Sequence, residues 1–248
     1  MEQKFNLLLE EVKNDPNILG FWLSGSRGKG LITEKSDYDC VILVKDEVFT
    51  DYREKFKERE DENFEFFIKT MQTFQDQTKW GSDQRWNRYS YTHVKPLVDK
   101  TEGEIEKLFA EVSVIPPDKI KEVVSGYLDA YINQIYRSLK CLRDGNLIAS
   151  HLEASESVSF LISALFGLEG RLKPYYKYIQ WELKNYPLKD LPWSTDEFLE
   201  KVIRILSSGD KSTQQEVLKS IEPIFRENNY GGVFDAWKEK LMWMKTYN

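Results

Sequence analysis

Cysteine is scarce in this sequence, which has two, Cys40 and Cys141, in 248 residues. Two cysteines exclude both a disulfide framework and a four-cysteine zinc site. Histidine is equally scarce: His93 and His151 lie far apart, and neither neighbours a candidate nucleophile. The sequence therefore gives no support to a catalytic triad of the serine or cysteine type, and we expect both thiols to be reduced.

Long apolar runs are also missing. The longest, from Val158 to Leu168, is interrupted by serines and a glycine and is too short to span a bilayer. The first residues carry acidic side chains within their apolar pattern, unlike a signal peptide. These features predict a cytoplasmic protein that does not bind a membrane.

An excess of positive charge is absent as well. Lys and Arg number 35 against 41 Asp and Glu, so the formal charge is -6. This balance, without a long basic stripe, argues against a nucleic-acid partner and against a polymerase. It leaves room for a locally positive pocket that binds a nucleotide, because local placement decides that property.

The first half of the chain has the pattern of a small α/β domain. Phe5, Leu8, Leu9 and Val12 recur at helical spacing and predict an opening helix that ends near residues 14–16. A mixed-charge helix is expected over residues 51–62, between two strands. The predicted strands are the β-rich runs at residues 18–26, 38–44, 63–70 and 89–99, of which the last contains Pro96 and suits an edge.

The sequence pattern changes at Val114–Asp118, where a Pro-Pro pair precedes a second half with helical periodicity. We expect an α+β protein with two domains: a small α/β domain with a mixed sheet over residues 1–115, and a helical bundle over residues 116–248. The predicted helices of the second half are 118–144, 147–168, 174–186, 195–208, 213–228 and 233–246.

The most informative stretch joins a Gly-Ser turn to two aspartates. Gly25 and Ser26 end a strand-like run, a short loop follows, and Asp37 and Asp39 begin the next one. Because strand side chains alternate, the two carboxylates share a face about 7 Å apart and can converge on one or two hard cations. Gly25 lets the backbone approach a phosphate, and Ser26 offers a hydroxyl and an amide.

Other phosphate-binding motifs do not match. No G-x-x-x-x-G-K-[ST] string occurs, and the glycines here lead into paired aspartates rather than into the helix of a G-x-G-x-x-G fingerprint. The paired acids favour a metal-bound nucleoside triphosphate.

Gly25-Ser26, an interval of ten residues and Asp37-Tyr38-Asp39 resemble the signature of the polymerase-β-like nucleotidyltransferase superfamily. The superfamily adds a third carboxylate on a later strand, for which Glu65 is the candidate. The resemblance implies that Asp37 and Asp39 hold two Mg²⁺ ions, and that Glu65 completes a metal site or acts as the general base. Gly25 and Ser26 would hold the β- and γ-phosphates of ATP or another nucleoside triphosphate.

Each of these residues also has a purely structural interpretation. An Asp-x-Asp at a strand start is commonly a turn or cap feature, and only the preceding Gly-Ser at family spacing favours the site. Glu65 alone is compatible with a half-exposed strand glutamate. Arg27 and Lys29 lie beside the proposed phosphates and either contact them or remain solvated loop charges.

The helical half is similar in layout to kanamycin- and lincosamide-type antibiotic nucleotidyltransferases. This resemblance implies a nucleotidyltransferase domain over residues 1–115 and a helical domain that binds substrate and nucleotide over residues 116–248. In those enzymes a lysine of the helical domain reaches the triphosphate, and Lys177 lies in a similar string, rich in aromatic and basic residues, over residues 170–183. If Pro174 opens a helix, Lys173 and Lys177 share one face. The alternative is that the aromatic residues pack the bundle and both lysines face solvent.

The helix expected over 118–144 carries Asp129, Asn133 and Arg137 on one face. Kanamycin-type enzymes have a catalytic glutamate at this place, whereas here the matching residue is Asn133. Asp129, one turn earlier, is therefore the alternative to Glu65 as general base. Glu153 and Glu156, near the start of the following helix, suit the helix dipole.

These observations predict a Mg²⁺-dependent enzyme that transfers AMP from ATP to a hydroxyl of a small molecule, such as an aminoglycoside or lincosamide antibiotic. Two alternatives stay open: a toxin–antitoxin-like module that modifies or binds a protein, and a domain that binds nucleotide without catalysis. Aromatic residues in the helical half are compatible with a homodimer.

Overall fold

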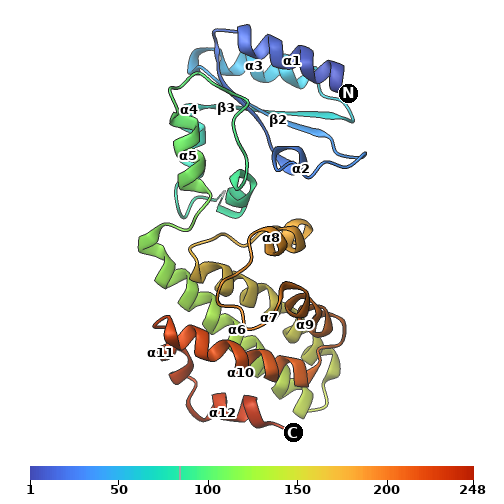
Figure 1. Ribbon diagram of the computed structural model, residues 1–248, viewed down its shortest axis with the longest axis vertical. Helices are drawn as coiled ribbons and strands as arrows, with labels where there is room; N and C mark the ends of the chain where they lie inside the picture. The colour runs from blue at the N-terminus through green and yellow to red at the C-terminus, as the bar shows by residue number, and fades with distance from the viewer. Residues whose placement is uncertain (84) are drawn as a thin grey trace. The chain divides into compact units, whose positions relative to one another are not determined.

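The β-rich first half of the chain builds a four-stranded mixed sheet (Figure 1). The computed structural model describes residues 1–83 and 85–248, and the chain divides into two compact units, Met1–Val114 and Ile115–Asn248. The elements of the first unit are α1 (Glu2–Asn14), β1 (Ile18–Leu23), α2 (Gly25–Gly28), β2 (Tyr38–Val44), η1 (Asp46–Val48), α3 (Phe49–Lys57), β3 (Phe64–Thr70), α4 (Met71–Thr78), η2 (Arg85–Tyr91), β4 (Val98–Asp99) and α5 (Glu104–Val112).

The strands follow the order β3-β2-β1-β4, so β3 and β4 form the edges of the sheet. β1 pairs antiparallel with β2 and with β4, whereas β2 and β3 are parallel. The parallel pair positions the site, because its register places Asp39 opposite Glu65.

Two separate apolar cores cover the two faces of the sheet. On one face, Cys40 and Phe66 pack with Leu8 of α1 and Phe56 of α3, and Figure 1 shows these two helices side by side. On the other face, Val41 packs with residues of α4 and α5. Because side chains alternate along a strand, Asp39 and Glu65 project from this second face.

The second unit is helical. Its elements are η3 (Pro117–Lys119), α6 (Ile120–Arg143), α7 (Leu147–Leu168), η4 (Tyr176–Tyr178), α8 (Ile179–Asn185), α9 (Thr195–Ser208), α10 (Lys211–Glu227), α11 (Gly231–Asp235) and α12 (Lys238–Thr246). The long helices α6 and α7 pack along each other around Leu128, Tyr131, Leu161 and Leu165. In the described part of the chain, no helix combines the length and the apolar character needed to cross a bilayer.

The predicted fold class, α+β, is confirmed, but several predicted elements are wrong in detail. The run 89–99 is a strand only at Val98–Asp99: Arg85–Tyr91 form a 3-10 helix, and His93 has a φ of 62°, which no strand adopts. The helix predicted over 233–246 is divided into α11, which ends at Asp235, and α12, which begins at Lys238 with a φ of 47°. Helices α4 and α5 are absent from the prediction.

Candidate functional site

Two carboxylates come together where the parallel strand pair begins. Asp39 of β2 and Glu65 of β3 are register partners, so their Cα atoms are about 5 Å apart and their side chains leave the same face of the sheet. Asp37 precedes β2 by one residue and continues the same alternation. Asp39 is half-buried, whereas Asp37 and Glu65 are exposed. The sequence-predicted acidic residues thus lie at one end of one face.

The acidic neighbours act on each other electrostatically. The pKa of Glu65 is raised above its ordinary value, first by desolvation and then by the negative charges of Asp39, Glu60 and Asp37. Carboxylates this close disfavour each other's ionised form. Without a counter-ion, the ionised cluster therefore works against the fold.

We expect Glu65→Gln to stabilise the folded protein at neutral pH. The pKa of Glu65 is higher in the folded state than in the unfolded state. The protonated side chain therefore contributes its full stability below the unfolded-state pKa, and this contribution is lost as the pH rises through the folded-state pKa. The neutral amide avoids this loss. Since Glu65 is exposed and screened, the gain is about 0.5 kcal/mol, measured by urea unfolding at pH 7.

Lowering the pH supplies the first control for this prediction, because the difference between Glu65→Gln and the wild type should vanish below the unfolded-state pKa of a glutamate. Glu62→Gln, an exposed glutamate on the preceding turn, supplies the second and should leave stability unchanged. A Glu65→Gln protein less stable than the wild type at pH 7 would contradict repulsion within the cluster.

The carboxylates fit a divalent cation that arrives with a nucleotide. Among residues 1–83 and 85–248, no group of three or more His, Cys, Asp or Glu side chains forms a ready-made metal cage. Mg²⁺ rarely uses one in nucleotide enzymes, where one or two carboxylates, substrate phosphates and water surround it. Desolvation is the main cause of the raised pKa of Glu65, and the repulsion from its acidic neighbours adds to it; a bound cation would relieve that repulsion.

The Gly-Ser loop is built tightly against Asp39. Gly25 opens α2 with a φ of 57°, in the left-handed region that favours glycine. A Cβ atom at this position would lie 2.1 Å from Oδ2 of Asp39, and the backbone N–H of Ser24 donates to the carbonyl of Asp39 at 2.8 Å. The loop and the first acidic strand therefore form one structural unit.

The hydroxyl of Ser26 is engaged within the loop. Ser26 is buried, and its Oγ donates to Oγ of Ser36 at 3.0 Å. The Ser36 hydroxyl also accepts the N–H of Thr33 at 2.9 Å. Ser26 would have to exchange this hydrogen bond to present its hydroxyl to a phosphate.

The side chains of Arg27 and Lys29 donate hydrogen bonds to backbone carbonyl groups. The interpretation of these two residues as solvated loop charges is therefore wrong. The Arg27 guanidinium donates to the carbonyl of Ser36 at 2.8 and 3.1 Å and stacks 3.7 Å from the Tyr38 ring centroid. The buried Lys29 amine donates to the carbonyls of Tyr89 and Thr92. Their predicted phosphate contacts stay predictions.

The other predicted residues belong to the second unit. Lys177 is exposed in η4, and its amine lies 5.4 Å from the Tyr178 ring centroid. The prediction that Lys173 and Lys177 share a helix face is wrong, because Tyr175 is extended and the helical turn begins after it. Asp129 accepts the indole N–H of Trp237 at 2.9 Å. The triphosphate contact of Lys177 and the role of Asp129 as general base stay predictions.

Glu153 and Glu156 of α7 join it to α6. Glu153 forms an ion pair with Arg137, and Glu156 accepts from the side-chain amide of Gln134. These contacts give both glutamates a structural role beyond the helix dipole.

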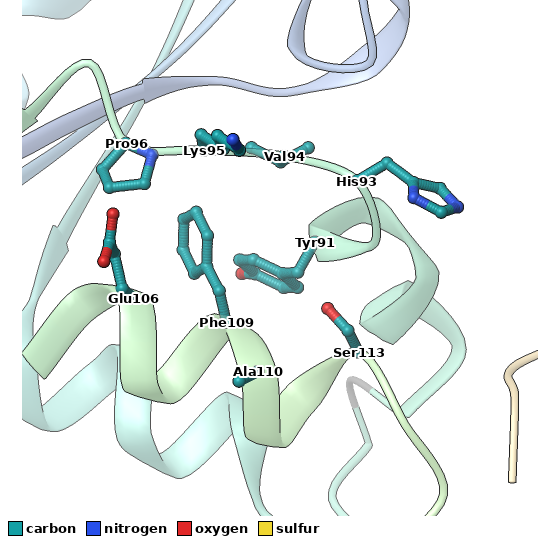
Figure 2. Close-up of a pocket in the computed structure, with 9 residues that line it drawn as sticks. All are labelled: Tyr91, His93, Val94, Lys95, Pro96, Glu106, Phe109, Ala110 and Ser113. Carbon is teal, nitrogen blue, oxygen red and sulfur yellow. The ribbon is translucent and has the colours of Figure 1, made fainter.

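A hollow of about 410 Å³ lies between the segment 91–96 and α5 (Figure 2). Figure 2 shows the rings of Tyr91 and Phe109 in this space, with Lys95 and Glu106 at its wall. None of the predicted acidic residues lines it. The hollow lies close to α2, because Val94, which lines it, packs against Gly28. A Cβ atom on Gly28 would lie 3.2 Å from Cγ2 of Val94.

One comparison with known proteins covers the segment that carries these residues. Residues 6–77 match the family model of the nucleotidyltransferase domain. This segment contains Gly25, Ser26, Asp37, Asp39 and Glu65, and the predicted class of enzyme, a nucleotidyltransferase, is confirmed. No curated protein matches the sequence.

One solved structure similar to this chain is that of a nucleotidyltransferase-like protein from Exiguobacterium sibiricum. It is 12% identical, with a TM-score of 0.40, over 92% of this chain and 80% of its own. A likeness this distant says nothing of the reaction.

Sequence reasoning passed over two residues on the same sheet face. Phe67 and Lys69 follow Glu65 at intervals of two along β3, and therefore project from the face that carries the carboxylates. The two-residue alternation of a strand, continued from Glu65, would have identified both residues.

Proposed function

We propose that the protein transfers AMP from ATP to a hydroxyl group of a small molecule in a Mg²⁺-dependent reaction. The observation that carries this proposal is the register pair of Asp39 and Glu65, held against the Gly25 loop within the segment that matches the nucleotidyltransferase domain. Carboxylates beside a glycine turn are suited to hold a metal-bound triphosphate.

In the proposed reaction, the acceptor oxygen attacks the α-phosphorus of ATP. The new bond joins that oxygen to phosphorus, the bond from the α-phosphorus to the bridging oxygen breaks, and pyrophosphate leaves with its electron pair. Glu65, whose pKa is raised, accepts the hydroxyl proton. Asp129 is the alternative base; it lies one helical turn before Asn133, the residue that stands where kanamycin-type enzymes have their catalytic glutamate.

The backbone around Gly25 would receive the β- and γ-phosphates, since its N–H groups open α2 and lack partners within the helix. Ser26 would exchange its hydrogen bond to Ser36 for one to a phosphate oxygen. Asp37 and Asp39 would hold Mg²⁺, and Glu65 would complete the metal site in the alternative in which Asp129 is the base. Bound there, Mg²⁺ supplies stabilisation of the negative charge that develops on the attacking and leaving oxygens.

Several further assignments belong to the same proposal. Lys177 would contact the triphosphate, and residues 116–248 would bind substrate. The acceptors indicated by the resemblance are aminoglycosides and lincosamides, which would make the activity one of antibiotic resistance. The proposed protein is located in the cytoplasm and forms a homodimer.

The testing experiment is pyrophosphate release with and without Mg²⁺. ATP, GTP, CTP and UTP are each incubated with a panel of aminoglycosides, lincosamides and hydroxylated carboxylic acids. We expect release with ATP and one acceptor class, and none without a divalent cation, because the ionised carboxylates alone would repel the triphosphate. Silence across the panel, with ATP binding intact by calorimetry, would contradict a small-molecule acceptor and favour a protein acceptor or a non-catalytic role.

A further inference from the structure

The face of β3 beyond Glu65 carries three chemically different side chains in a row. Glu65, Phe67 and Lys69 lie opposite Asp39, Val41 and Leu43 of β2. Along the strand, Phe67 is about 7 Å and Lys69 about 13 Å from Glu65, measured between Cα atoms. β3 is an edge strand, so this row is bordered by β2 on one side alone.

Phe67 is an exposed aromatic residue in a strand whose other two phenylalanines are buried. Its side chain is 41% accessible, against 2% for Phe64 and 8% for Phe66. In the part of the chain that the structure describes, no other aromatic ring packs against it. An accessible ring on an edge strand is a platform for a flat apolar group.

Lys69 is a partly buried cation without an acidic partner. Its amine donates to the side-chain carbonyl of Gln77 in α4, and no ion pair joins it to a carboxylate within residues 1–83 and 85–248. Burial lowers the pKa of this amine to about 8. An ammonium group has three donors, of which Gln77 takes one. The remaining donors suit a carboxylate or phosphate oxygen.

We propose that Phe67 and Lys69 form the acceptor subsite, which takes a hydroxylated small molecule with a flat apolar middle and an anionic group at its far end. This inference rests on the proposed function, because it places the acceptor hydroxyl at Glu65. The apolar middle then lies on Phe67, and the anion meets Lys69. Such an acceptor differs from the aminoglycosides indicated by the sequence resemblance, because the charge of Lys69 would repel a polycation.

The test uses two probes of the same size and shape, of which only the first carries a negative charge: para-hydroxyphenylpropionate and its primary amide. Calorimetry on the full-length protein should show the carboxylate binding about tenfold more tightly, the size expected for a hydrogen bond to a charged group. Lys69→Met should erase this difference, whereas Phe67→Ala should weaken both probes. Lys57→Met, on α3 at the opposite face of the sheet, is the matched control and should keep the preference.

Loss of folding would not mimic this result. Methionine fills the space of the Lys69 stem without a buried charge, so Lys69→Met should melt no earlier than the wild type. Equal affinity for the two probes, or no binding of either, would overturn the subsite. A weaker ATP affinity in Lys69→Met with an unchanged probe affinity would instead make Lys69 a nucleotide contact. Because no nucleotide is needed, binding with the expected preference but without pyrophosphate release would overturn the proposed function alone.

Discussion

Asp39→Asn is expected to lower the rate of nucleotide transfer by about 10³-fold or more without unfolding the protein. Asn has the size of Asp but lacks the charge that would hold a cation between β2 and β3. Losing several kcal/mol of transition-state stabilisation corresponds to a rate loss of this size. The substitution also removes one of the charges that raise the pKa of Glu65, so the free energy of unfolding should not fall.

The decisive measurement is pyrophosphate release per enzyme at saturating ATP, alongside urea unfolding of the same preparation. Asp37→Asn should behave in the same way. Asp46→Asn is the matched control, because Asp46 is an exposed aspartate just past the other end of β2, and its transfer rate should equal the wild-type rate. Near-normal transfer in both Asp37→Asn and Asp39→Asn would refute the assignment of these carboxylates to the metal.

The part of the site that the sequence predicts well is the part encoded locally. Asp37, Asp39 and Glu65 lie at strand starts, where alternation alone fixes the face from which each side chain projects. The strand containing Glu65 was identifiable from its apolar neighbours, and parallel pairing then set it opposite Asp39. The α+β class follows in the same way from hydrophobic periodicity.

What the sequence did not predict depends on contacts between distant segments. Lys29 is buried because two carbonyls about sixty residues later accept its amine. The run at 89–99 has the pattern of a strand, but its first three residues end a 3-10 helix. The two carbonyls belong to Tyr89 in that helix and to Thr92 directly after it. Burial of Lys69 similarly depends on α4, a helix that periodicity did not reveal. Tertiary packing decides such positions, and local patterns do not record it.

The second large effect is expected from Gly25→Ala. Two separate costs meet at this position. The backbone has a φ of 57°, which costs an alanine about 1 kcal/mol. The new methyl group would also lie 2.1 Å from Oδ2 of Asp39, so the carboxylate must turn away because the loop backbone is bonded to β2. We expect transfer to fall by about 10²-fold or more, since misplacement of a reacting group by about 1 Å has that consequence.

Gly30→Ala separates these two costs. Gly30 has a φ of 72°, but a Cβ atom there would meet no atom within 4 Å. Both variants should therefore lose about 1 kcal/mol of unfolding free energy, whereas Gly25→Ala alone should lose transfer. If Gly30→Ala lost as much activity as Gly25→Ala, backbone strain in the loop would be the cause. If both variants kept their transfer activity, the position of the Asp39 carboxylate beside Gly25 would not matter for transfer. The Gly25 loop and the acidic strand would then act independently of each other.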